Sequence, residues 1–232
     1  IRCGINRISF GLQSTDNKVL KMLGRIHTYE DFTQSLDIAR RAGFTNISAD
    51  IMSALPGQSV NDYVNTLNTV AGLGLQHISA YSLIVEEDTH LYEHLKDYPP
   101  LPDEDAERNM YHVTEDILAG AGFYRYEISN YAKPGFESRH NKSYWELTDY
   151  IGIGLGASGF YKGKRYSNTS DIKTYIDGTA KGEVSFIREV EEGSVKDRIE
   201  EYMFLGLRKM EGVSYSEFLK IFGQDIHSIY AD

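Results

Sequence analysis

The first hundred residues alternate between two hydrophobic patterns, one typical of strands and the other typical of helices. Short runs rich in β-branched and aromatic residues at 7–12, 46–52 and 77–85 predict strands. One helix is expected to begin at Thr28, which has an acidic residue at capping-box spacing. A second is expected after Ser59, because apolar residues then recur at helical intervals. This order predicts a strand–helix unit that repeats along the chain.

The spacing of these units indicates the fold class. The strands start near residues 7, 46 and 77, which leaves room for one helical layer between successive strands. Such spacing is typical of parallel strands joined by right-handed crossovers. It predicts an α/β fold, either a barrel or a doubly wound sheet. No GxGxxG motif follows the first strand, which disfavours a dinucleotide-binding fold.

The pattern is less regular in the rest of the chain. A proline-rich connector at 98–107 precedes another helical pattern. Strands are expected in the glycine-punctuated stretch 150–161 and at 164–168. A charged stretch, 188–201, leads into a helix, and a last helix is expected to begin at Ser214.

The composition is that of a soluble globular protein. Of the 232 residues, 41% are hydrophobic and 25% charged, and no apolar run approaches the ~18 residues that a membrane span needs. The formal net charge of −10 disfavours nucleic acid and anionic membrane surfaces as partners. A single cysteine, Cys3, excludes an internal disulfide framework. With no secretory signal visible, it predicts a cytoplasmic location.

Polar residues stand near the ends of the predicted strands, where parallel α/β folds gather their function. They are Gln13 after the first strand, Asp50 in the second, Glu86 and Glu87 after the third, and Arg25 before the second helix. A carboxylate can accept hydrogen bonds from ribose hydroxyls, and an arginine can bind a carboxylate. The set therefore suits a ligand with hydroxyls and a carboxylate, although each residue is equally consistent with a structural role.

Other kinds of site find less support. The histidines and the one cysteine form no closed zinc site, and no GxSxG elbow of an α/β-hydrolase occurs. The stretch Gly152–Gly159 lacks the GK[ST] of a phosphate-binding loop. Its glycines are better explained by a strand that passes close to another backbone.

Several short motifs, in order, resemble one known family. They are NRISFGLQS, GRIH, DIMSALPGQS, HISAYSLIVEEDT and YEISNYAKPGFESRHNKSYW. Together they resemble the oxygen-independent coproporphyrinogen III oxidase-like family of radical S-adenosylmethionine (SAM) proteins, and within it the heme chaperone branch. The resemblance runs from about Asn6 to beyond Leu207 and so covers nearly the whole chain.

The resemblance implies the second half of a radical SAM partial (β/α)6 TIM-like barrel. Residues 1–97 would hold its fourth to sixth βα units, 98–187 a family extension, and 188–232 the start of a small C-terminal helical domain. The family's CxxxCxxC motif, which binds a [4Fe-4S] cluster, precedes these units and is absent from this sequence. Because three thiolates must converge on the cluster, Cys3 alone cannot hold it and is interpreted as a packing residue.

The resemblance also implies SAM contacts at four positions. Gln13 matches a glutamine near the ribose, Arg25 an arginine that pairs with the methionyl carboxylate, and Asp50 an aspartate that binds the ribose hydroxyls. Ile84 lies near a backbone contact to the adenine. Of these, Gln13, Arg25 and Asp50 are also the residues that the strand pattern assigns to the ligand-binding mouth.

A heme site is implied by the HNxxYW motif of residues 140–145, which is similar to a motif associated with heme binding in the chaperone branch. Neutral His140 could be an axial ligand of heme iron, and Tyr144 and Trp145 could stack on the porphyrin. Arg139 and Arg165 could bind the propionates. The alternative is a structural motif, with the histidine bonded to a backbone carbonyl and the tryptophan in the core.

The leading functional hypothesis is a heme chaperone-like radical SAM protein that binds heme and delivers it to an acceptor protein, which the sequence does not identify. One alternative is an oxygen-independent coproporphyrinogen III oxidase, which forms protoporphyrinogen IX by radical decarboxylation. Another is an inactive scaffold, because radical catalysis is not expected from these residues without the cluster. Half a barrel also leaves an open sheet edge and apolar surface, which predicts self-association.

Overall fold

The computed structural model describes residues 3–182, 187–191 and 193–230. The chain forms two compact units, residues 1–137 and 138–232. The division between them falls inside the segment 98–187 that was predicted as one extension. The predicted division into three parts, 1–97, 98–187 and 188–232, stays a prediction. Each of the two units is described by itself.

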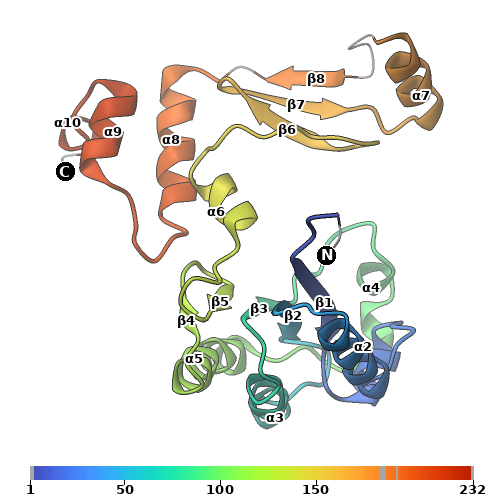
Figure 1. The fold of residues 1–232 in the computed structure, drawn as a ribbon. Coiled ribbons are helices and arrows are strands. Elements are labelled where there is room, and N and C mark those ends of the chain that lie inside the picture. The colour runs from blue at the N-terminus through green and yellow to red at the C-terminus, as the bar shows by residue number, and fades with distance from the viewer. Residues whose placement is uncertain (1–2, 183–186, 192, 231–232) are drawn as a thin grey trace. The chain divides into compact units, whose positions relative to one another are not determined.

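The first unit is built on a five-stranded sheet. Its strands are β1 (Arg7–Gln13), β2 (Asn46–Ser53), β3 (His77–Ser82), β4 (Tyr124–Arg125) and β5 (Asn130–Ala132). Their order in the sheet is β1-β2-β3-β5-β4; β1, β2 and β3 are parallel, and β5 and β4 join antiparallel to their neighbours. The parallel strand–helix repeat predicted from the spacing is confirmed (Figure 1).

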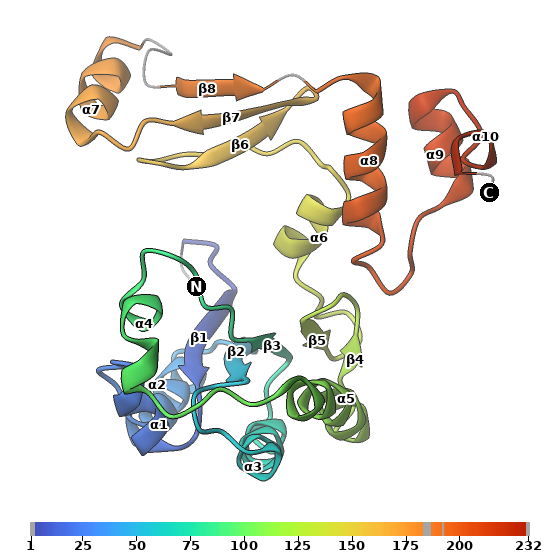
Figure 2. The same ribbon diagram turned by 180° about the vertical axis from the view of Figure 1, so that it is seen from behind.

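Helices cover one face of this sheet. The helices of the unit are α1 (Asn17–Met22), α2 (Tyr29–Arg41), α3 (Val60–Ala71), α4 (His90–Glu93), the 3₁₀ helix η1 (Leu95–Asp97) and α5 (Glu104–Gly120). The buried core combines strand residues such as Leu12 and Ile51 with Leu36 of α2, Leu67 of α3 and Met110 of α5. Figures 1 and 2 show these three helices beside the sheet. Burial of this apolar face fixes the side on which each strand residue lies.

Two helices begin with a capping box. Thr28 and Ser59 each accept a hydrogen bond from the backbone N–H three residues on, and the acidic side chain there accepts one from the backbone N–H of the cap. The capping box predicted at Thr28 is therefore confirmed, and the structure adds a second at Ser59, where the sequence predicted only the start of a helix.

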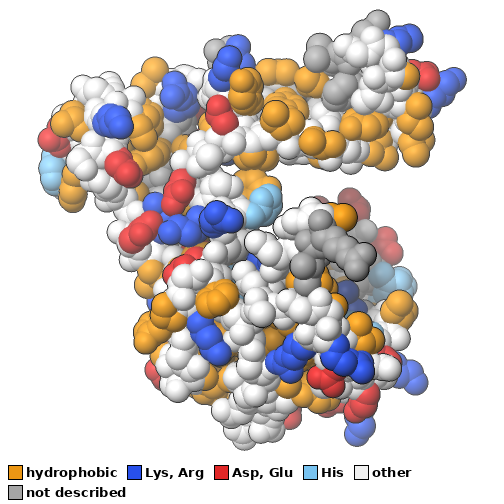
Figure 3. All heavy atoms as spheres, in the orientation of Figure 1, with side chains coloured by type: hydrophobic (Ala, Val, Ile, Leu, Met, Phe, Trp, Pro, Cys, Tyr) orange, Lys and Arg blue, Asp and Glu red, His pale blue; other side chains and the backbone are white. Residues whose placement is uncertain are grey.

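The second unit combines a small antiparallel sheet with helices. Its elements are α6 (Arg139–Trp145), β6 (Ser158–Tyr161), β7 (Lys164–Asn168), α7 (Ile172–Lys181), β8 (Ile187–Glu191), α8 (Val195–Gly206), α9 (Tyr215–Phe222) and α10 (His227–Tyr230). The sheet has the order β6-β7-β8. Ile199, Phe218 and Ile226 form a separate buried cluster of the helical part. Apolar side chains also gather on the outer surface of α7 and the sheet, where Ile172 and Ile176 are exposed (Figure 3).

Several predicted boundaries were wrong. The third strand ends at Ser82 rather than Val85, because its partner β2 ends at Ser53, the residue paired with Ser82, and leaves residues 83–85 without a strand to pair with on that side. The stretch 150–161 is mainly loop, and only its last four residues form β6. Residues 187–191 form strand β8, so the start of the charged stretch that was expected to lead into a helix is a strand.

Candidate functional site

The face of the sheet turned away from the helices is polar. In register across β1, β2 and β3, Gly11 pairs with Asp50 and Asp50 with Ser79, while Ser9 pairs with Ser48. Strands that are covered by apolar layers on both faces are expected to be hydrophobic throughout. The polar side chains here indicate that this face lines a polar interior, as the site of an α/β barrel does.

Gln13 and Asp50 are both neighbours of Gly11: Gln13 is two positions further along β1, and Asp50 is opposite Gly11 in β2. Asp50 is the cross-strand partner of Gly11 and accepts a 3.1 Å hydrogen bond from the Ser9 hydroxyl. Gln13 ends β1 with φ of 70° and is 9% exposed. Its amide nitrogen lies 3.0 Å from where a Cβ on Gly11 would stand. Because Gly11 has no side chain, the space beside it is open to both the Gln13 amide and the Asp50 carboxylate. These two groups could therefore hydrogen-bond to the hydroxyls of one ligand.

The other two residues assigned to SAM lie apart from this pair. Arg25 is exposed in the loop between α1 and α2, and no ion pair of its side chain occurs among the described residues. Ile84 follows β3 and is 76% exposed. The structure thus brings together two of the four predicted SAM contacts.

A buried histidine on the polar face was missed by the sequence analysis. His77, which is 0% exposed, bonds Ser48 Oγ at 2.8 Å through Nδ1 and Tyr126 Oη at 2.9 Å through Nε2. Burial, followed by the positive charge of Arg7, lowers its pKa to about 3. The imidazole is therefore neutral near pH 7, and both ring nitrogens are engaged within the protein. A histidine at the start of an otherwise apolar strand was the available signal.

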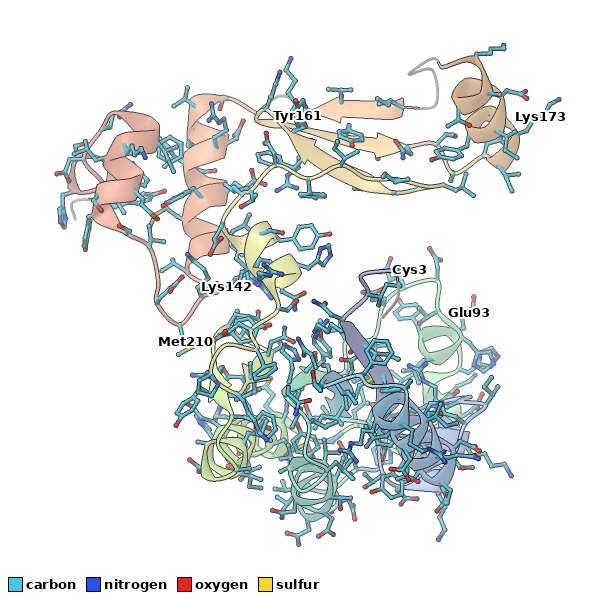
Figure 4. All side chains as sticks on the ribbon, in the orientation of Figure 1. Cys3, Glu93, Lys142, Tyr161, Lys173 and Met210 are labelled. Carbon is cyan, nitrogen blue, oxygen red and sulfur yellow. The ribbon has the colours of Figure 1, made fainter. Side chains whose placement is uncertain are left out.

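The HNxxYW motif forms helix α6, which bears Lys142 (Figure 4). Its first turn is capped by Ser138, which accepts a hydrogen bond from the Asn141 N–H. His140 is exposed, and its ring meets that of Tyr144 edge-on at a centroid distance of 4.8 Å. No hydrogen bond of its ring nitrogens occurs in the described part of the chain. One of them can therefore coordinate heme iron without first losing a protein partner.

Trp145 lies on a different side of α6 from His140. Successive residues of an α-helix are about 100° apart around its axis. Trp145, five positions after His140, therefore projects about 140° away from it around that axis. The guanidinium of Arg208 lies over the indole, 4.4 Å from the ring centroid. Trp145 also borders a cavity of about 470 Å³, which is lined further by residues of α8, α9 and the loop between them. The structure therefore groups His140 with Tyr144, while Tyr144 and Trp145 both border a second cavity, of about 180 Å³, that Arg165 also lines.

The two arginines predicted to bind propionates differ in their surroundings. The guanidinium of Arg165 is held by Glu201 through Nε and Nη2, and it lies 5.2 Å from the centroid of the Phe160 ring. Arg139 is exposed, and no ion pair of its side chain occurs among the described residues. A propionate at Arg165 would have to compete with Glu201.

The cysteine and the histidines are the residues that could bind a metal ion. Cys3 is exposed and lies in the segment before β1 (Figure 4), so its interpretation as a packing residue was wrong. His90 of α4 and His94, which directly follows this helix, form an HxxxH pair that the sequence analysis passed over, with ring centroids 4.2 Å apart. No cluster of three or more histidine, cysteine, aspartate or glutamate side chains suited to a metal occurs among the described residues. These residues do not fit a [4Fe-4S] cluster, which takes thiolate ligands.

Comparison with known proteins identifies the family. A model of the radical SAM superfamily matches residues 1–70. The heme chaperone HemW of Bacillus subtilis is 40% identical over 228 residues, which are 98% of this chain and 60% of that protein. HemW of Lactococcus lactis is 40% identical over 229 residues, with the same coverage. The chain belongs to the HemN/HemW-like family of radical SAM proteins.

A solved structure supports the fold. Coproporphyrinogen III oxidase (HemN) from Escherichia coli, described as a radical SAM enzyme, matches with a TM-score of 0.80 and 20% identity. The match covers 98% of this chain and 55% of that one. The predicted α/β fold, a partial TIM-like barrel, is confirmed. The chain spans about 60% of the length of the HemW relatives described above.

Membership of this family implies two cofactors, SAM and a [4Fe-4S] cluster. The pair formed by Gln13 and Asp50 fits the hydroxyl-bearing part of SAM. Among the described residues no helix is long and apolar enough to span a membrane.

Proposed function

We propose that this chain is part of a heme chaperone of the HemN/HemW-like family, which binds heme and delivers it to an acceptor protein. The observation that carries the proposal is the likeness to proteins named as heme chaperones, at 40% identity over 98% of the chain. The acceptor is a further protein, and the site of action is the cytoplasm.

Helix α6 is the proposed heme-binding element. The exposed His140 has a ring nitrogen available for iron, and Tyr144 is stacked edge-on beside it. A porphyrin bound here would lie against Tyr144, because Trp145 turns to another side of the helix. Arg139, exposed next to the histidine, is the nearest cation in sequence for a propionate.

SAM is proposed to bind at the polar face of the first unit. Gln13 and Asp50 would hold the ribose, Arg25 the methionyl carboxylate, and the backbone at Ile84 the adenine. When bound, the cluster supplies the electron for reductive cleavage of SAM, but its ligands lie outside the residues described here. These residues contribute binding and orientation.

The second candidate is coproporphyrinogen III oxidase. The fold likeness to HemN, at a TM-score of 0.80, favours it. That likeness is at 20% identity and therefore supports the fold alone. The chaperone proposal has the stronger support, because the higher sequence identity is to the chaperones.

A hemin titration followed by absorbance tests the proposal. The chain should give a saturable Soret shift that is lost in His140→Ala. His112→Ala is a matched control, since His112 is an exposed histidine on another helix, α5, and it should behave as the parent chain. A shift retained in His140→Ala would move the iron ligand elsewhere. No shift in any variant would contradict heme binding by these residues.

A further inference from the structure

Arg208 is a partly buried cation without a carboxylate partner among the described residues. It lies just after α8, and its guanidinium stacks over the Trp145 ring at 4.4 Å. No ion pair of Arg208 occurs in the part of the chain that the structure describes. The contrast is with Arg165 of the same unit, whose guanidinium is held by Glu201.

Two donors in this stack are buried and lack an acceptor. They are the Arg208 Nε–H and the Trp145 indole Nε1–H. Buried donors are almost always paired, because leaving one unpaired forfeits its hydrogen bonds to water. The stacking fixes the positions of both groups but gives neither N–H a hydrogen-bond acceptor. The two donors could therefore bind an acceptor that the described residues do not supply.

A carboxylate is the acceptor that fits this arrangement best. A guanidinium binds carboxylates with short charge-assisted bonds, and an indole N–H can add a second directed bond. Trp145, but not Arg208, borders the cavity of about 470 Å³, which gives space for a ligand group. Three glutamates, Glu146, Glu211 and Glu217, and two lysines, Lys209 and Lys220, also line it, and Glu211 is paired with Lys209 at 3.2 Å. Because the glutamates outnumber the lysines, recognition of a carboxylate would depend on directed donors rather than on net charge.

We infer that Arg208 and Trp145 together bind a carboxylate of the ligand, and that this carboxylate is a propionate of heme. The inference rests on the proposed function for the identity of the ligand. It assigns to Trp145 the role of hydrogen-bond donor in place of the porphyrin stacking expected from the sequence. It also replaces Arg165 by Arg208 as a propionate-binding arginine of this unit, beside Arg139.

The test compares hemin with hemin dimethyl ester, in which both propionates are neutral. In Arg208→Gln, the affinity for hemin should fall about tenfold to hundredfold, the loss expected for one charge-assisted bond. The affinity for the ester should stay that of the parent chain. Trp145→Phe keeps an aromatic ring and removes the N–H, and it should show a smaller loss that is again specific for hemin. If Arg208→Gln does not fold, Trp145→Phe tests the inference in its place.

Arg198→Gln is the matched control, because Arg198 is an exposed arginine on α8. It should leave both affinities unchanged. Equal loss of hemin and ester binding in Arg208→Gln, or no loss of either, would overturn the inference while leaving heme binding intact. A hemin-specific loss in Arg165→Gln instead would return the role to Arg165. If the parent chain binds neither ligand, the proposed function fails with the inference.

Discussion

The buried His77 predicts a specific dependence of stability on pH. The folded chain holds its pKa at about 3, whereas the ordinary value is 6.5. Below about pH 6.5 the unfolded chain therefore takes up a proton that the folded chain refuses until about pH 3. Stability is fully present above pH 6.5 and is lost as the pH falls. At pH 5 the loss is about 2 kcal/mol, since 1.5 pH units at 1.36 kcal/mol each separate that pH from the unfolded pKa.

The value at pH 5 is insensitive to the folded pKa, provided that this pKa stays below about 4. The loss of unfolding free energy between pH 8 and pH 5 is measured by urea unfolding at each pH, monitored by far-UV circular dichroism. His77→Gln keeps a donor and an acceptor near Ser48 and Tyr126 but does not titrate. The parent chain should lose about 2 kcal/mol more than this variant between the two pH values.

His140→Gln is the control for this experiment, because it replaces an exposed histidine in the same way. Equal pH dependence of the parent chain and His77→Gln would refute the reasoning, since it would mean that His77 takes up a proton as readily when folded as when unfolded. Arg7→Gln should raise the folded pKa, because the charge of Arg7 is the second cause of its low value, but it should leave the difference at pH 5 unchanged as long as that pKa stays below about 4.

Three further predictions concern stability in urea. Leu67→Ala removes a fully buried side chain and should cost about 2–5 kcal/mol, whereas Ile38→Ala at an exposed position should stay within about 0.5 kcal/mol; similar losses would contradict the assigned core. Thr28→Ala removes a capping box and should cost about 1 kcal/mol, and an unchanged midpoint would argue against the cap. Gly159→Ala would place a methyl group 2.2 Å from the Tyr166 ring and should cost about 1–3 kcal/mol; a neutral result would mean that the ring moves freely.

The regular part of the fold could be predicted because local signals agreed with one another. The strand at 46–53 and the helix after Ser59 each combine a hydrophobic period with a turn or cap. The interpretation of the glycine-rich stretch was also correct at Gly152, where a Cβ would stand 2.3 Å from the Ser158 carbonyl oxygen. Only close approach of two backbone segments explains that glycine.

The site was less predictable, because it depends on contacts between distant residues. Arg208 stacks on Trp145 across more than sixty positions of sequence, and no periodicity reports such a contact. The separation of His140 from Trp145 follows from helical geometry. The HNxxYW motif by itself does not show that its residues form a helix, so the sequence predicted that all of them bind one ligand. Strand β8 was missed because three of its five residues are charged and its two apolar residues stand three positions apart, so that no alternation appears in the sequence.

The most direct test of the proposed function uses the full-length protein with its cluster reconstituted, under anaerobic conditions. It is incubated with SAM and coproporphyrinogen III in one experiment and with hemin in another. A chaperone should bind hemin saturably, with a Soret shift that depends on His140, and should form no protoporphyrinogen IX. Formation of protoporphyrinogen IX, with 5′-deoxyadenosine released in proportion to it, would contradict the account and identify an oxidase.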